Sequence, residues 1–164
     1  MGKPEILTES PDRAMGFTPA VKRFFRHVGY QSRRGTLPFR QVGFSCFSEE
    51  QVLEKYIAEL LPEGHCRTAV DIGAGDGRTG SNTLALFKRG WKGLGVEWDS
   101  RKAYKLAKTY QHLSEVSSCR LRVTPDNVLA LLGMYEIERS FSVLNIDIDS
   151  YDYWVLDAIL NGYR

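Results

Sequence analysis

A short apolar segment that runs straight into alternating glycines constrains the fold of this chain more than any other feature. Residues 68–72 have the composition of a strand buried in a parallel sheet, and Gly73, Gly75 and Gly77 follow directly. Glycine lets a backbone turn sharply and allows close approach where a side chain would stand in the way. A helix is predicted next, from about Ser81 to Arg89, so this segment is expected to form a strand, a tight turn and a helix.

Strands and helices alternate along the rest of the chain, which is typical of a parallel sheet covered by helices. Ahead of the glycines, the spacing of apolar residues predicts a helix that ends at Pro62. After the glycines, the expected strands are residues 93–97, 121–124 and 141–146, and the expected helices begin near Asp99, Val128 and Trp154. Asp99 or Ser100 is expected to cap the first of these helices. The sequence therefore predicts an α/β fold with a doubly wound, mostly parallel sheet of the Rossmann-like type.

Length and composition are those of one ordinary globular domain. The chain has 164 residues, of which 43% are hydrophobic and 26% charged. These fractions argue against fibrous, coiled-coil and largely disordered proteins. No apolar run is long enough to cross a bilayer and no secretory leader is recognisable, so we expect a cytoplasmic protein without a membrane partner. The three cysteines lie far apart and indicate neither a disulfide framework nor a zinc site.

Residues 1–45 form a basic N-terminal arm that differs in charge from the α/β domain expected over residues 46–164. No acidic residue lies between Asp12 and Glu49, whereas this stretch carries the cations Arg13, Lys22, Arg23, Arg26, Arg33, Arg34 and Arg40. Residues 19–29 are expected to form a short helix. The cations and their aromatic neighbours fit either a nucleic-acid contact or an amphipathic helix with solvated charges, and we favour the second interpretation. Binding of an anionic sugar or phosphate carrier is a third interpretation with less support.

An acidic residue ends the second predicted strand. Glu97 lies 20 residues after Gly77, where a carboxylate can accept hydrogen bonds from both hydroxyls of a ribose. A strand, a glycine-rich turn, a helix, a strand and a terminal acid, in that order, indicate an adenosine-type cofactor. The third glycine of the nicotinamide fingerprint is replaced by Arg78, and Asp71 and Asp76 would repel a pyrophosphate. The sequence therefore favours S-adenosylmethionine, which carries an ammonium and a sulfonium.

These motifs resemble those of class I S-adenosylmethionine-dependent methyltransferases, and among them the FkbM-like methyltransferases. The resemblance covers about residues 45–164 and rests on residues 47–50, 71–77, 81–83, 90–97 and 144–154. It implies that Glu97 holds the ribose and that a further set of residues shapes the cofactor pocket. That set is Asp71, Gly73, Ala74, Gly75, Asp76, Gly77, Asn82 and Asp147, with Asp126, Asn127 and Val128 lying against the adenine. Trp98 is expected either to cover the adenine face or to pack on its own strand. For Asp126 the alternative is a cap on the short helix that follows.

Acidic residues cluster after the fourth predicted strand. Asp147 and Asp149 are two residues apart and point the same way in an extended segment, and Asp152 follows in the next loop. We predict that Asp147 lies near the methionine part of the cofactor and that Asp149 or Asp152 is the catalytic base for the accepting hydroxyl. Asp152 fits equally well as a helix cap. A divalent metal held by the three acids is a less favoured alternative, and no metal site is predicted.

The resemblance implies O-methylation of a sugar or small-molecule hydroxyl, with S-adenosylmethionine as cofactor. A nucleic-acid methyltransferase that uses the basic arm is an alternative, and a non-catalytic cofactor-binding or assembly module is another. Four strands are predicted where the resembled fold has seven, so we expect a sheet that lacks its C-terminal strands. One explanation is that the chain is part of a longer protein. The other is that the fourth strand, at the exposed edge of the sheet, pairs with a partner or with a second copy of the chain, and pairing with a second copy would give a homo-oligomer.

Overall fold

A computed structural model describes residues 43–46 and 49–163 of the chain. All of them belong to one unit, Phe39–Arg164. The predicted basic arm and its short helix lie almost wholly outside the described residues. The elements are α2 (Glu49–Leu60), β1 (Thr68–Ile72), α3 (Leu84–Lys88), β2 (Lys92–Glu97), α4 (Ser100–Tyr110), β3 (Val116–Arg120), α5 (Val128–Met134), β4 (Val143–Ile146) and α6 (Asp152–Gly162).

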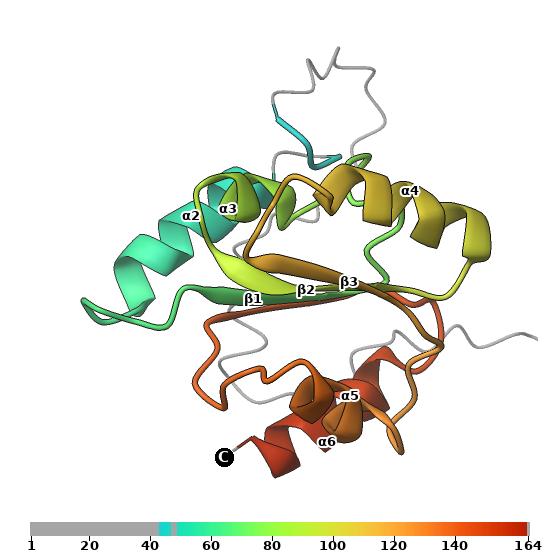
Figure 1. The fold of residues 1–164 in the computed structure, drawn as a ribbon. Helices are drawn as coiled ribbons and strands as arrows, with labels where there is room; N and C mark the ends of the chain where they lie inside the picture. Colours follow the sequence, from blue (N-terminus) through green and yellow to red (C-terminus); the bar gives the residue numbers. More distant parts are fainter. Residues whose placement is uncertain (1–42, 47–48, 164) are drawn as a thin grey trace, which may run out of the picture. The chain divides into compact units, whose positions relative to one another are not determined.

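The described strands form one parallel sheet in the order β3-β2-β1-β4. Each neighbouring pair runs in the same direction, with Val70 aligned to Leu94 on one side and to Leu144 on the other. Figure 1 shows α2, α3 and α4 on one face of the sheet and α5 and α6 on the other. The prediction of an α/β fold with a parallel sheet is therefore confirmed.

Each face of the sheet has its own hydrophobic core. Val70 and Ile72 of β1 pack with the buried side of α5 and α6, whereas Ala69 packs with α3 and α4. Because side chains alternate along a strand, Asp71 shares the face of Ala69 and is directed toward α3. Within the described part of the chain, no helix is long and apolar enough to cross a membrane.

Most predicted elements are confirmed, but the third strand was placed wrongly. The expected strand at residues 121–124 is irregular, and β3 is the preceding segment, Val116–Arg120. At an edge of the described sheet, β3 is partly exposed and carries two serines, so it lacks the apolar run that marks a buried strand. The apolar residues that follow it, Leu121 and Val123, instead join the core beneath α5.

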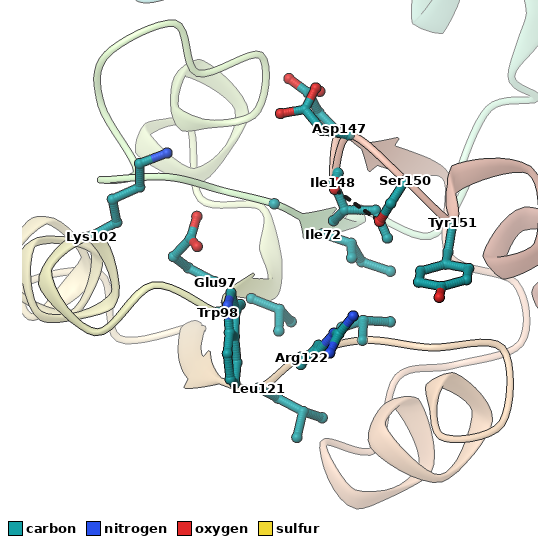
Figure 2. Close-up of a pocket in the computed structure, with 14 residues that line it drawn as sticks. Ile72, Glu97, Trp98, Lys102, Leu121, Arg122, Asp147, Ile148, Ser150 and Tyr151 are labelled. Atoms are coloured by element: carbon teal, nitrogen blue, oxygen red, sulfur yellow. Dashed lines mark hydrogen bonds between the residues drawn. The ribbon is translucent and has the colours of Figure 1, made fainter.

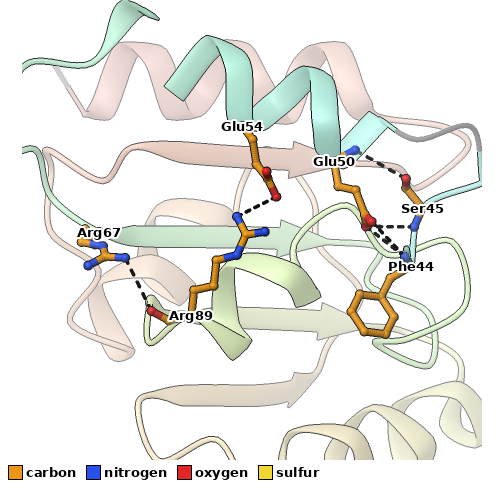
Figure 3. A network of polar contacts seen from close by, with 6 residues as sticks. All are labelled: Phe44, Ser45, Glu50, Glu54, Arg67 and Arg89. Atoms are coloured by element: carbon orange, nitrogen blue, oxygen red, sulfur yellow. Dashed lines mark hydrogen bonds and ion pairs between the residues drawn. The ribbon is translucent and has the colours of Figure 1, made fainter. Parts of the chain in front are cut away.

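A buried carboxylate fixes the start of α2 to the segment before it. Glu50 is 8% exposed, and it accepts hydrogen bonds from the amides of Phe44 (3.0 Å to Oε2) and Ser45 (3.2 Å). The Ser45 hydroxyl in turn accepts the Glu50 amide at 3.4 Å (Figure 3). This reciprocal pair satisfies the Glu50 amide in the first turn of α2, which has no partner within the helix, and joins it to residues 44–45.

We predict that Glu50→Ala destabilises the protein by about 1–3 kcal/mol, because it strips buried amides of their acceptor. Glu59→Ala is the matched control, since its ion pair with Lys55 at 3.8 Å is exposed, and it should cost less than about 0.5 kcal/mol. Urea unfolding of the two variants measures the difference. Equal losses would show that Glu50 contributes no more than a surface charge.

Candidate functional site

A cavity of about 510 Å³ opens where β1, β2 and β4 reach their carboxyl ends. Figure 2 shows its lining, which comes from the turn after β1, the end of β2 and the segments after β3 and β4. The chain adds β2 and β3 on one side of β1 and then crosses to place β4 on the other. Ligands of open α/β sheets bind at such a point, outside the carboxyl ends of the strands.

The glycine-rich turn is held tightly against the strands on both sides. The amides of Gly73 and Ala74 both donate to the carbonyl oxygen of Val96, each at 2.9 Å. A Cβ on Gly73 would lie 1.9 Å from the carbonyl oxygen of Asp147, and its φ of +90° favours glycine. Gly77 packs against α4. The turn therefore reaches β2 and the segment after β4 at once, and glycine is required for that approach.

Glu97 lies in the cavity wall and fixes the segments beside it. Its carboxylate accepts the amide of Gly75 on Oε2 at 3.0 Å and the amide of Asp99 on Oε1 at 2.7 Å. Asp99 is the N-cap of α4, as predicted, and accepts the amides of Arg101 and Lys102. Each carboxylate oxygen has capacity for a further hydrogen bond. Glu97 can therefore hold a ligand with two adjacent donors while it orders the turn and the helix start.

Asp71 lies behind the cavity, at the centre of a polar network. It is 1% exposed and accepts hydrogen bonds from Thr83 Oγ1 (2.5 Å) and Asn145 Nδ2 (2.8 Å). Asn82 extends the network by donating to Asn145 Oδ1 at 3.2 Å. Burial raises the pKa of Asp71, as do the charges of Asp147 and Glu97, against the lowering effect of these hydrogen bonds. Asp71 and Asn82 thus join β1, β4 and the start of α3.

Asp76 accepts hydrogen bonds within the glycine-rich turn and does not line the cavity. Its carboxylate accepts the amides of Arg78 (2.9 Å) and Thr79 (2.7 Å) and the Thr79 hydroxyl. Desolvation raises the pKa of Asp76, but these hydrogen bonds and the charge of Lys105 outweigh it, so the pKa lies below its ordinary value. The side chain therefore stabilises the turn as a bound acceptor.

The acidic residues after β4 divide between the cavity and the loop. Asp147 and Asp149 line the cavity, and Asp149 has a left-handed backbone with φ of +56°. Asp152 accepts the amides of Ile148 (2.9 Å) and Ser150 (3.0 Å). Desolvation raises the pKa of Asp152, but its backbone hydrogen bonds outweigh that effect and lower it. Of the two predicted bases, Asp149 therefore faces the cavity and Asp152 holds the loop.

The three acidic residues do not form a metal site in the structure. Within residues 43–46 and 49–163, no three His, Cys, Asp or Glu side chains are arranged to hold a metal ion. Asp152 directs its oxygens to the amides of its own loop. The less favoured alternative of a divalent metal at this position has no support in the geometry.

The residues predicted to lie against an adenine occupy different places. Trp98 lines the cavity and is 59% exposed. Asn127 supports the segment after β3, because its side chain accepts the Thr124 amide at 2.8 Å and donates to the Arg122 carbonyl oxygen at 2.9 Å. Val128 is buried in the core, and Asp126 lines a separate hollow of about 350 Å³.

Several cavity residues were missed by the sequence analysis. Leu121, Arg122 and Val123 line the cavity but were assigned to a strand, and Lys102 lies in the first turn of α4. Tyr151 contributes from the segment after β4. The position of Lys102, three residues after the predicted cap Asp99, is a signal that could have placed it near the end of β2. Nothing in the local sequence marks the other four.

Comparison with family models, curated proteins and solved structures gives no significant match to this chain. The fold and the site define an α/β protein with a ligand-sized cavity at the carboxyl edge of a parallel sheet. Its function must be argued from the residues of that cavity.

We predict that Asp71→Asn becomes more stable relative to the wild type as the pH rises. A raised pKa in the folded state means that the native protein holds the proton more tightly than the unfolded chain. As the pH rises above the ordinary aspartate pKa of about 4, Asp71 ionises first in the unfolded chain. The free energy of unfolding of the wild type therefore falls, until Asp71 has ionised in the folded protein as well. The neutral amide does not titrate.

Unfolding free energies of Asp71→Asn and the wild type, measured between pH 4 and pH 8, test this sign. Asp157→Asn serves as the control, since Asp157 is exposed on α6, and its difference from the wild type should not change with pH in this way. A stability difference for Asp71→Asn that stays constant or falls with pH would contradict the prediction.

Proposed function

We propose that the protein is an S-adenosylmethionine-dependent methyltransferase of the FkbM-like type, which methylates a hydroxyl oxygen of a sugar or small molecule. The observation that carries the proposal is the position of Glu97. Its carboxylate is in the cavity wall at the end of β2, beside the glycine-rich turn whose Gly75 amide it accepts at 3.0 Å. An adenosine ribose presents two adjacent hydroxyl donors that suit such an acceptor.

The strand order supports a Rossmann-like methyltransferase fold. The order β3-β2-β1-β4, with helices on both faces, agrees with the first four strands of a doubly wound sheet. The cavity then lies at the switch point between β1 and β4, which is the ligand position of that fold.

The hydrogen bonds of the turn favour an S-adenosyl ligand over a dinucleotide. A pyrophosphate site needs backbone amides that are directed at the ligand. Here the amides of Gly73 and Ala74 donate to Val96, and that of Gly75 donates to Glu97. The amide of Gly77 donates to the carbonyl oxygen of Ala74, and the amides of Arg78 and Thr79 donate to the carboxylate of Asp76. A turn so occupied, beside carboxylates, suits a ligand with positive charge.

The residues of the cavity divide the work of binding and proton transfer. S-adenosylmethionine, when bound, supplies an electrophilic methyl group on a sulfonium. Glu97 accepts the ribose hydroxyls, Trp98 offers an aromatic face to the adenine, and Asp147 places negative charge beside the methionine part. Asp149 accepts the proton of the acceptor hydroxyl as that oxygen takes up the methyl group. Holding the acceptor oxygen in line with the methyl group supplies further rate enhancement.

Calorimetric titration of the full chain with S-adenosylhomocysteine, and separately with NAD, tests the proposal. We expect S-adenosylhomocysteine to bind and NAD not to bind. Glu97→Gln should weaken S-adenosylhomocysteine at least tenfold, or about 1.4 kcal/mol, because the amide accepts fewer hydrogen bonds from the ribose.

Glu115→Gln is the control for this titration, since Glu115 forms an exposed ion pair with Lys92 at 3.6 Å away from the cavity. Urea unfolding of both variants shows whether the turn and α4 keep their structure. Binding of NAD alone would overturn the proposal. If both variants weaken S-adenosylhomocysteine binding equally, Glu97 does not contact the ligand.

A further inference from the structure

Charged side chains of both signs line the 510 Å³ cavity, and two of them are cations. Lys102 comes from the first turn of α4 and Arg122 from the segment after β3. The acidic residues Asp147 and Asp149 come from the segment after β4. Figure 2 shows Arg122 and Lys102 apart from Asp147 across the cavity. A ligand in this cavity therefore meets the two cations together with the carboxylate of Glu97 at the end of β2, and meets the other two carboxylates in the segment after β4.

The two cations are available to a ligand. The ion pairs within the described residues join Lys55 to Glu59, Arg89 to Glu54 and Lys92 to Glu115, all outside this cavity. Lys102 lies near Asp99, whose Oδ1 already accepts the amides of Arg101 and Lys102 at 2.9 Å each. Neither Lys102 nor Arg122 thus has an ion-pair partner in the part of the chain that the structure describes.

The backbone that carries Arg122 is fixed. Its carbonyl oxygen accepts Asn127 Nδ2 at 2.9 Å, and the amide of Thr124 donates to Asn127 Oδ1 at 2.8 Å. Asn127 therefore clamps the segment on which Arg122 is placed, and Leu121 and Val123 on either side pack into the core. A guanidinium on such a support can meet a planar or tetrahedral anion with two parallel hydrogen bonds.

We propose that the methyl acceptor carries an anionic group, a phosphate or a carboxylate, which Arg122 and Lys102 bind. This inference rests on the proposed function. In that function the ribose lies at Glu97, the adenine at Trp98 and the methionine ammonium at Asp147, and the inference assigns the two cations to the acceptor rather than to the methionine carboxylate. An acceptor with its anion at Arg122 and its hydroxyl at Asp149 reaches across the cavity. The acceptor class is therefore a small hydroxylated anion, such as a sugar phosphate or a hydroxy acid.

Glycerol 3-phosphate, glycerate and glycerol are the probes that test this inference. Each is titrated into the full chain saturated with S-adenosylhomocysteine, and binding is followed by the shifts of backbone amide resonances. We expect one of the two anions to bind at least tenfold more tightly than glycerol. The anion that does so identifies the group, phosphate or carboxylate. If neither anion binds better than glycerol, the inference is wrong.

Arg122→Gln and Lys102→Gln supply the matched variants, with Arg101→Gln as control. Arg101 is an exposed cation in the same turn as Lys102 but does not line the cavity. We expect Arg122→Gln to weaken the anion at least tenfold, Lys102→Gln to weaken it less, and Arg101→Gln to leave it unchanged. Equal weakening by Arg101→Gln and Arg122→Gln would mean a general charge effect and would overturn the inference.

Titrations with S-adenosylhomocysteine alone separate this inference from the proposed function. If Arg122→Gln weakens S-adenosylhomocysteine tenfold, the arginine belongs to the cofactor and the inference is wrong. If S-adenosylhomocysteine does not bind the wild type but an anion still binds through Arg122, the proposed function fails, whereas the anion site is supported.

Discussion

The carboxylate of Glu97 is the interaction on which the rest of the site depends. It joins the end of β2 to the glycine-rich turn through Gly75 and to the start of α4 through Asp99. A buried carboxylate that accepts two amides is fixed in orientation, and hydrogen bonds to a charged group are worth about 1.5–3 kcal/mol each. The same group that orders these segments also lines the cavity, where it can accept hydrogen bonds from a ligand. Glu97 thus stabilises the local structure and, in the proposed function, also binds the ligand.

A second carboxylate holds the sheet together behind the cavity. Asp71 accepts Thr83 and Asn145, and so connects β1 to α3 and β4. Its burial and the nearby charge of Glu97 both disfavour ionisation. Two acidic residues at neighbouring strands are costly to bury, and the hydrogen bonds that each receives offset this cost. The acidic interior of the site also excludes ligands that concentrate negative charge at the turn.

Sequence patterns identified the elements that are built from local signals. The apolar run of β1 was predicted correctly, and Asp99 is one of the two residues predicted to cap α4, because burial and capping depend on residues close in sequence. The strand β3 was misplaced because an edge strand needs no apolar run. The roles of Asp152 and Asn127 depend on which amides their side chains reach, and sequence alone left Asp152 open between base and cap. Arg122 and Lys102 both line the cavity but come from separate segments of the chain, which no local pattern links.

A crystal structure of the full chain with S-adenosylhomocysteine is the most direct test of the central claim. The account predicts the ligand in the cavity at the carboxyl ends of β1, β2 and β4, with both ribose hydroxyls hydrogen-bonded to Glu97 and with Arg122 and Lys102 free of the ligand. A ligand bound elsewhere, or one whose ribose makes no contact with Glu97, would contradict the account.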